Sequence, residues 1–339
     1  MKYFFLIVIP IIIAVLNFFF KKVSLFSNYS GEVHQKFLGE KKVPLIGGIY
    51  LIFFSLFFFQ NHLILCLFLF LIFLIGFSSD VGFITSPFIR LLLQLIVTII
   101  LVIFLDLQIL STRVVFLDHF LSYYFASILF TSFCLIILMN GSNFIDGLNG
   151  LVLGYYLIII LILYKVGLIN DLFYDGLELQ FFIYFLSVLL LFNFSNRLYL
   201  GDAGSYLLSF LIGYLLISIY NNNLTFSPFF VVLLLWYPCY ENLFSIIRKF
   251  KLNKSPVIPD NKHLHQLIFI FLKKKFKHKS YQTNNYASVI INLYNLIIFY
   301  FGSLDIYNTQ YQIILIILNV IIYTVIYSRF ITYLFKTKI

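Results

Sequence analysis

Charged residues are scarce in this sequence, since Asp, Glu, Lys and Arg make up only 11% of its 339 residues. Soluble chains carry about 25% charged residues, so too few polar side chains remain here to cover a water-facing globule. A disordered chain is excluded as well, because disorder requires low hydrophobicity. Cysteine is also rare. Cys66, Cys134 and Cys239 each lie inside an apolar run without paired spacing, which favours helix packing over disulfides or metal binding.

Hydrophobic residues, in contrast, make up 62% of the chain, with 44 Phe and 25 Tyr. The mean hydropathy of +1.01 is typical of an integral membrane protein. A membrane helix needs about 20 mostly apolar residues to cross a hydrocarbon core of roughly 30 Å. Such runs predict an all-α, polytopic membrane protein with about eleven transmembrane helices. The runs are 3–20, 43–59, 62–77, 88–105, 121–139, 148–165, 179–194, 204–220, 228–246, 285–303 and 311–334.

The positive charges indicate an orientation. When the segments between the runs are assigned to alternate sides, all Lys and Arg residues except Lys2, Arg113 and Lys165 fall on one side. By the positive-inside rule, this predicts a periplasmic N-terminus and a cytoplasmic C-terminus. Run 3–20 lacks a small-residue cleavage site, so we interpret it as a retained first helix rather than a signal peptide. Topology therefore accounts for most of the net charge of +10, and a nucleic-acid partner is not expected.

Polar residues interrupt the hydrophobic pattern at four places, all on the predicted cytoplasmic side. At the first, Asn140, Asn143, Asp146 and Asn149 recur every third residue among glycines. Oxygen donors in this pattern suit a hard cation and hydrogen bonds to a polar ligand, and glycine lets a ligand approach the backbone. The alternative is a polar turn with Asx caps, which explains one or two of these residues but not four at constant spacing.

The second interruption runs from Gly201 to Ser205 at the entry of a predicted helix. Small residues expose backbone amides at a helix N-terminus, where phosphate binds readily. Asp202 could then hold a divalent ion that bridges this phosphate. A plain helix cap by Asp202 or Ser205 is the alternative.

The third and fourth interruptions are weaker. Asp80 ends a predicted helix, where a lone aspartate is usually interfacial. The stretch 254–266 is basic and contains His263 and His265. Two histidines and one carboxylate make a thin metal site, so a loop that binds nucleotide phosphates fits better. A solvated basic loop near anionic lipid is the alternative.

Together, these motifs resemble the polyprenyl-phosphate N-acetylhexosamine-1-phosphate transferases of glycosyl transferase family 4. The resemblance is greater to the branch that initiates enterobacterial common antigen and lipopolysaccharide O-antigen than to the peptidoglycan branch. The matching residues are Lys42 to Gly48, Ser79-Asp80 with Pro87, Arg90 and Gln94, Asn140 to Leu151, Gly201 to Ser205, and Glu241 through Arg248 to His265.

The resemblance implies a bacterial inner-membrane enzyme that transfers N-acetylhexosamine-1-phosphate, from GlcNAc or a related deoxy sugar, to undecaprenyl phosphate. The donor would be a UDP-N-acetylhexosamine, UMP would be released, and the cofactor would be Mg²⁺, with Mn²⁺ as the alternative. It further implies one catalytic domain over 1–339, and a homodimer would be common for the family. The active site would form from the cytoplasmic loops 21–42, 78–87, 140–147, 195–203 and 247–284.

The resemblance also assigns roles to single residues. Asn143 and Asp202 match positions that bind the metal. The expected catalytic residues are Asp80, Asp202, His263 and His265. The expected nucleotide-binding and diphosphate-binding residues are Lys42, Asn140, Asp146, Asn149, Gly201, Ser205 and Arg248.

The chain departs from the family pattern at Ser79, where most members carry the first of two aspartates, at Phe83, usually acidic, and at Asn149, often Asp. These departures leave a catalytically impaired homologue as one alternative. Phospho-MurNAc-pentapeptide transferase is a second, although the His263-Leu264-His265 pattern differs from that branch's triple histidine. A membrane transporter is the third, although the polar motifs gather at one face rather than at the bilayer middle.

Overall fold

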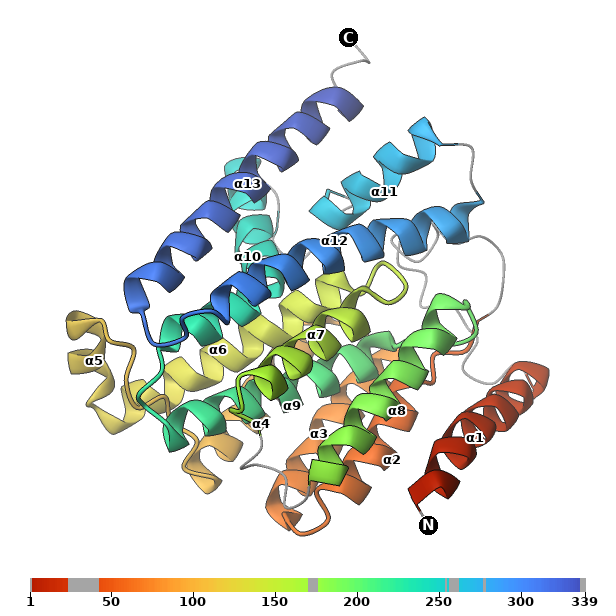
Figure 1. The fold of residues 1–339 in the computed structure, drawn as a ribbon, viewed down its shortest axis with the longest axis horizontal. Helices are drawn as coiled ribbons and strands as arrows, with labels where there is room; N and C mark the ends of the chain where they lie inside the picture. The colour runs from red at the N-terminus through yellow and green to blue at the C-terminus, as the bar shows by residue number, and fades with distance from the viewer. Residues whose placement is uncertain are drawn as a thin grey trace.

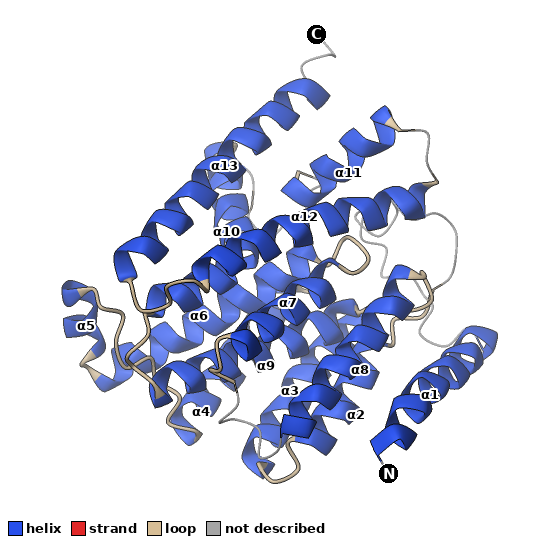
Figure 2. Ribbon diagram, in the orientation of Figure 1, coloured by secondary structure: helices blue, strands red, loops and turns tan. Residues whose placement is uncertain are grey.

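The computed structural model describes residues 2–23, 43–169, 176–253, 255, 262–276 and 279–335. Within these ranges, the chain forms thirteen helices and no strand (Figures 1 and 2). The β-type pairing in the described ranges is a single parallel bridge between Leu45 and Tyr199. The all-α prediction is therefore confirmed.

Every predicted apolar run coincides with a helix. These helices are α1 (Lys2–Val23), α2 (Gly47–Phe58), α3 (Leu63–Asp80), α4 (Pro87–Phe104), α6 (Tyr124–Ile145), α7 (Leu151–Lys165), α8 (Gly176–Phe194), α9 (Gly201–Asn222), α10 (Pro228–Lys251), α12 (Ser280–Gly302) and α13 (Thr309–Phe335).

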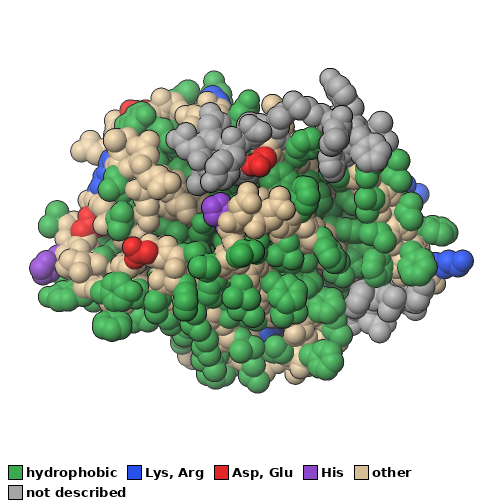
Figure 3. Space-filling view, turned by 90° about the horizontal axis from the view of Figure 1, so that it is seen from below, with side chains coloured by type: hydrophobic (Ala, Val, Ile, Leu, Met, Phe, Trp, Pro, Cys, Tyr) green, Lys and Arg blue, Asp and Glu red, His purple; other side chains and the backbone are tan. Residues whose placement is uncertain are grey.

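The protein is a multi-pass membrane protein. In the described part of the chain, α3, α4, α6, α9, α10, α12 and α13 are long and apolar enough to cross a membrane, whereas α2, α7 and the apolar part of α8 are shorter. Hydrophobic side chains cover most of the face in Figure 3, as a lipid-facing surface requires. The predicted orientation of the termini stays a prediction.

Two helices were not predicted. α5 (Val115–Leu121) lies between α4 and α6, and α11 (Leu264–Lys275) lies inside the segment 247–284, which the sequence indicated as a loop. Both are too short for a search based on membrane-spanning length. α11 nevertheless buries Leu264, Leu267 and Phe269, so packing of one apolar face stabilises it.

The predicted loops were also too long. α3 continues to Asp80, α6 continues to Ile145, and α9 already begins at Gly201, so the polar motifs lie at helix ends. The physical reason is that a helix satisfies its own backbone hydrogen bonds in water as well as in lipid. A change in composition therefore marks the membrane boundary and not the end of the helix.

α9 is the central helix of the bundle, and most of its side chains are buried (Figure 1). It packs against α2, α3 and α6. Small residues on α9, including Gly204, Ser205, Ser209 and Gly213, let these neighbours approach closely. The N-terminus of α9 meets the C-terminal ends of α3 and α6, and this junction holds most of the polar motifs.

Candidate active site

Asp80 is bound to the N-terminus of α9. Its Oδ1 accepts a hydrogen bond from the Asp202 backbone N–H at 2.9 Å, and its Oδ2 accepts one from Ala203 N–H at 3.0 Å. Gly201 makes this possible, because its φ is +73° and a Cβ there would lie 2.6 Å from Asp80 Oδ2. The Asp80 carboxylate, rather than a phosphate, therefore uses these two amides of the predicted anion site.

Asp202 forms an ion pair with Arg90 from α4. Arg90 Nη1 lies 2.5 Å from Asp202 Oδ2 and 2.6 Å from Ser79 Oγ. The Ser79 hydroxyl also donates to Asp202 Oδ2 at 2.7 Å. Ser79 is thus part of a network centred on the Asp202 carboxylate.

Asn143 lies at the same junction, on the last turn of α6. Its Nδ2 donates to the Tyr206 hydroxyl at 3.0 Å, and its Oδ1 is 3.5 Å from Ser205 Oγ. Tyr206 and Ser205 belong to the first two turns of α9, so the contacts fix the amide oxygen of Asn143 beside the start of this helix.

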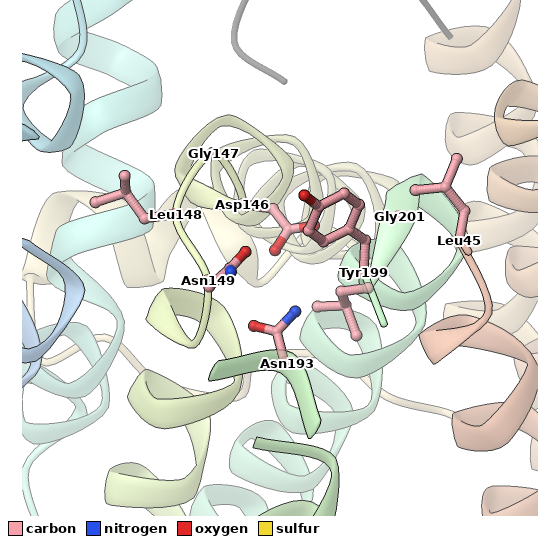
Figure 4. A pocket seen from close by; sticks show the side chains of 9 residues that line it. Leu45, Asp146, Gly147, Leu148, Asn149, Asn193, Tyr199 and Gly201 are labelled. Carbon is pink, nitrogen blue, oxygen red and sulfur yellow. The ribbon is translucent and has the colours of Figure 1, made fainter. Parts of the chain in front are cut away.

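A pocket opens next to this junction (Figure 4). It contains about 380 Å³ of empty space, part of it open to solvent. Asp146, Asn149 and Asn193 direct their polar atoms toward this space in Figure 4, and Tyr199 lies on its other side. The complete lining is Leu45, Asp146, Gly147, Leu148, Asn149, Asn193, Tyr199, Leu200 and Gly201.

The carboxyl group of Asp146 is electrostatically unfavourable as an anion. Burial raises its pKa well above the ordinary value, and the negative charges of Asp202 and Asp80 raise the pKa further. Carboxylates gathered in this way are typical of a site that binds a cation or handles charge during a reaction.

A second polar cluster joins α10, α11 and α13. Glu241 of α10 is only 1% exposed, and it accepts hydrogen bonds from His263 Nδ1 at 3.0 Å and Leu264 N–H at 3.3 Å. The Tyr323 hydroxyl of α13 donates to Glu241 Oε2 at 2.8 Å. A carboxylate that accepts from Nδ1 fixes the ring orientation of the histidine and directs Nε2 to the opposite side.

The histidines connect this cluster to the pocket loop. The rings of His263 and His265 are stacked with centroids 5.7 Å apart, and the His263 ring lies 5.4 Å from the Phe144 ring. A Cβ on Gly147 would lie 2.9 Å from His265 Nε2. His263 and His265 therefore lie beside the end of α6.

The remaining predicted residues differ in their positions. Asn140 Nδ2 donates to Gln94 Oε1 of α4 at 2.8 Å, so this amide joins two helices and is not part of the pocket lining. Arg248 follows Glu241 by two turns on α10 and donates to Ser245 Oγ at 3.1 Å. Lys42 lies outside the described residues. The functional roles predicted for all site residues stay predictions.

The structure adds residues that sequence reasoning missed. Asn193 and Tyr199 line the pocket, and Tyr323 supports Glu241. A polar side chain at the end of the apolar run 179–194 could have indicated Asn193. Tyr323 is one of many tyrosines in apolar segments, and nothing in the sequence distinguishes it.

The oxygen donors at this junction are of the chemical type that binds a hard cation. In the described ranges no three His, Cys, Asp or Glu side chains form a metal-binding group. Asp202 and Asn143, however, offer a carboxylate and an amide oxygen, and the carboxylates of Asp80 and Asp146 lie nearby. Oxygen atoms are the ligands that Mg²⁺ prefers. Because Mg²⁺ usually keeps waters and substrate phosphates in its shell, one carboxylate and one amide are a sufficient protein contribution.

Comparison with known proteins confirms the predicted family resemblance. Residues 62–220 match the model of glycosyl transferase family 4. This range holds Asp80, Asn143, Asp146 and Asp202, as well as Asn149 and Asn193 of the pocket, but not the Glu241–His263 cluster.

Three relatives with assigned functions match this chain over a length similar to that of the family model. The chain is 31% identical over 163 residues to decaprenyl-phosphate N-acetylglucosaminephosphotransferase of Mycolicibacterium smegmatis, covering 41% of this chain and 40% of the relative. It is 28% identical over 160 residues to undecaprenyl-phosphate alpha-N-acetylglucosaminyl 1-phosphate transferase of Thermotoga maritima, covering 47% and 48%. A probable undecaprenyl-phosphate N-acetylglucosaminyl 1-phosphate transferase of Bacillus subtilis is 31% identical over 138 residues, covering 39% and 37%. The matches thus span less than half the length of each of these relatives.

Proposed function

We propose that this protein transfers an N-acetylhexosamine-1-phosphate from a UDP-sugar to undecaprenyl phosphate and releases UMP. The product, undecaprenyl-diphospho-sugar, would begin the synthesis of a cell-surface polysaccharide. The observation that carries the proposal is the polar pocket at Asp146 and Asn149, which adjoins the carboxylate junction at Asp202. Both belong to residues 62–220, which match the model of glycosyl transferase family 4.

The proposed reaction is a phosphoryl transfer. An oxygen of the acceptor phosphate bonds to the sugar-linked phosphorus of the donor, the bond from this phosphorus to the bridging oxygen breaks, and UMP leaves with the electron pair. In such reactions the protein mainly positions groups and neutralises charge. Asp146, Asn149 and Asn193 would bind the nucleotide, and Arg90 and the histidines would stabilise phosphate charge.

A bound Mg²⁺ or Mn²⁺ would neutralise charge on the diphosphate and leaving group. Asn143 and Asp202 would hold this ion through their oxygens. Ser79 and Arg90 both contact Asp202 Oδ2, so they determine how much negative charge Asp202 presents. A general base is not required, because a phosphate with a second pKa near 6 is already largely ionised at neutral pH.

The lipid acceptor would approach along α4. Arg90 lies in the first turns of this helix, next to Phe88 and Ile89, whose side chains are 67% and 49% exposed. An apolar surface directly beside a charged junction suits a molecule with a phosphate head and a polyprenyl chain. The distribution of Lys and Arg supports a cytoplasmic position of this end of the bundle in the inner membrane.

Release of UMP tests the proposal. Purified protein in detergent would receive Mg²⁺, undecaprenyl phosphate, and one donor at a time from a panel of UDP-N-acetylhexosamines and UDP-MurNAc-pentapeptide. We expect UMP release with one N-acetylhexosamine donor that depends on the lipid. Release with UDP-MurNAc-pentapeptide alone would instead indicate the peptidoglycan branch. If the folded protein released no UMP with any of these donors, the proposed transfer would be contradicted.

A further inference from the structure

Asparagines of α12 contact the pocket loop from outside the segment that matches the family. Asn284 and Asn292 are 0% and 8% exposed, and both belong to α12, which packs against α7. Buried amide side chains in an apolar bundle are costly unless they are hydrogen bonded. Their partners are backbone groups of Asn149 and Gly150, the residues that join the pocket to α7.

Each contact satisfies one backbone group of this loop. Asn284 Oδ1 accepts a hydrogen bond from the Asn149 N–H at 2.7 Å, and Asn292 Nδ2 donates to the Gly150 carbonyl at 3.0 Å. Asn193 of α8 completes the set, since its Oδ1 accepts from the Gly150 N–H and its Nδ2 donates to Leu198 O at 2.8 Å. Three amide side chains thus fix two consecutive residues.

The surrounding residues are suited to these contacts. Gly150 has φ +74°, a left-handed conformation that residues with a Cβ rarely adopt. On α7, a Cβ at Gly154 would lie 2.3 Å from Asn292 Nδ2, so only glycine leaves space for this side chain. Because the backbone of Asn149 is held in this way, its side chain has a defined direction into the pocket (Figure 4).

We propose that Asn284 and Asn292 are positioning residues of the nucleotide site, and that α12 thereby sets the affinity for the uridine nucleotide. This inference rests on the proposed function. Binding energy is lost when a ligand must order the loop that it contacts. The two asparagines order the Asn149 loop in advance, so their removal weakens binding more than it lowers the rate of transfer.

The same helix provides a matched control. Asn295 is also 0% exposed, and its Oδ1 accepts a hydrogen bond from Trp236 Nε1 at 2.9 Å. Asn295→Ala and Asn284→Ala each remove one buried side-chain acceptor from α12. A purely structural role predicts equal effects of the two substitutions, whereas the proposal predicts that only Asn284→Ala weakens nucleotide binding.

The test measures UMP binding by calorimetry, since UMP is common to every UDP-sugar donor. We expect about 10-fold weaker binding for Asn284→Ala and Asn292→Ala, as for the loss of one well-formed hydrogen bond, and no change for Asn295→Ala. With an active donor, KM for this donor should rise while kcat stays within about twofold. Melting temperatures without ligand show that the variants are folded. Asn284→Ser is the second variant if Asn284→Ala does not fold.

The outcomes separate the inference from the function on which it rests. If the wild-type protein binds UMP and Asn284→Ala and Asn292→Ala bind it equally well, the positioning role is wrong and the proposed function stands. If kcat falls and KM is unchanged, the asparagines support the fold or the chemistry rather than the nucleotide site, and the inference is wrong. If the wild-type protein does not bind UMP, the proposed function fails, and the inference fails with it.

Discussion

Charged side chains lie at both ends of α9, but the protein surrounds them differently at each end. The helix has 22 residues, so its ends are about 33 Å apart. At the end near Asn222, each charge is matched by neutral hydrogen-bond partners. At the end near Gly201, three carboxylates gather around a junction and a pocket.

Arg113 and Asp118 illustrate the Asn222 end. Arg113 Nη2 donates to the carbonyls of Leu224, Thr225 and Phe226 at 3.0, 2.7 and 2.9 Å, which secures the loop after α9. Burial acts to raise the pKa of Asp118, but hydrogen bonds, mainly from Thr112, outweigh it and lower the pKa. The folded state thus stabilises the charged form of Asp118.

The Gly201 end shows the opposite. Burial and the charges of Asp202 and Asp80 raise the pKa of Asp146, so the folded state disfavours the charged form. A cluster of carboxylates that disfavours its own ionisation does not stabilise the fold. Proteins generally retain such a cluster where their function requires it. The comparison teaches that charge alone does not mark a site in this membrane protein. The distinguishing feature is charge that the protein leaves incompletely compensated.

The largest effect should follow from changes to the proposed metal ligands. Asp202→Asn and Asn143→Ala should lower lipid-dependent UMP release on the order of 10²- to 10³-fold, because charge stabilisation in the reaction is lost. Initial rates over a range of Mg²⁺ concentrations measure the effect. Wild-type rates in either variant would show that the metal assignment is wrong.

Arg113→Met at the Asn222 end is the control for this comparison. The loss of its hydrogen bonds to carbonyls should reduce the free energy of unfolding by about 1–3 kcal/mol. Activity per folded molecule should be unchanged. If Arg113→Met lowered kcat as strongly as Asp202→Asn, the two ends would not differ in function as the structure indicates.

A smaller effect should follow from Arg90→Met. Without the guanidinium at 2.5 Å, Asp202 keeps more negative charge, and the acceptor phosphate loses a cation. We expect a loss of activity of about 10- to 100-fold, together with tighter Mg²⁺ binding in a titration that follows thermal stability. Unchanged Mg²⁺ affinity would indicate that Arg90 does not modulate the charge of Asp202.

Glu241→Gln should have a still smaller effect. An amide can accept from His263 Nδ1 but lacks the charge of the carboxylate, so the imidazole is oriented less firmly and activity should fall about 10-fold. Tyr323→Phe removes one donor to Glu241 and should lower activity less. Wild-type activity in Glu241→Gln would exclude a positioning role for the carboxylate.

The contributions of Asp146 and Asp118 to stability should change with pH in opposite directions. Each should shift the melting temperature by a few degrees at most. The raised pKa of Asp146 contributes stability that is complete below pH 3.8 and lost as pH rises through the folded-state pKa. The lowered pKa of Asp118 contributes stability that is present above pH 3.8 and lost as pH falls.

Melting temperatures without nucleotide or metal from about pH 3 to pH 8 provide the measurement. As pH rises, Asp146→Asn should gain stability relative to the wild-type protein, and Asp118→Asn should lose stability relative to it. Equal slopes for both variants would contradict the electrostatic difference between the two ends.

Much of the fold could be predicted because hydrophobic length is a local property. Each apolar run became a helix, since every run can satisfy its backbone only internally in lipid. The short helices α5 and α11 were missed, because what stabilises a short helix is packing against distant neighbours. The extension of α6 through Asn143 was missed because the change to polar residues does not end a helix.

The sequence by itself determined that this is a helical membrane protein, and its motifs resemble a known family, which predicts that Asn143, Asp146 and Asp202 belong to one site. Composition and hydrophobic length carry the first of these conclusions without knowledge of contacts. Only the tertiary structure decided that Asp80 binds the amides of α9, that Arg90 pairs with Asp202, and that Asn284 holds the Asn149 loop. These contacts join residues more than 100 positions apart, so packing of helices, rather than any local pattern, brings them together.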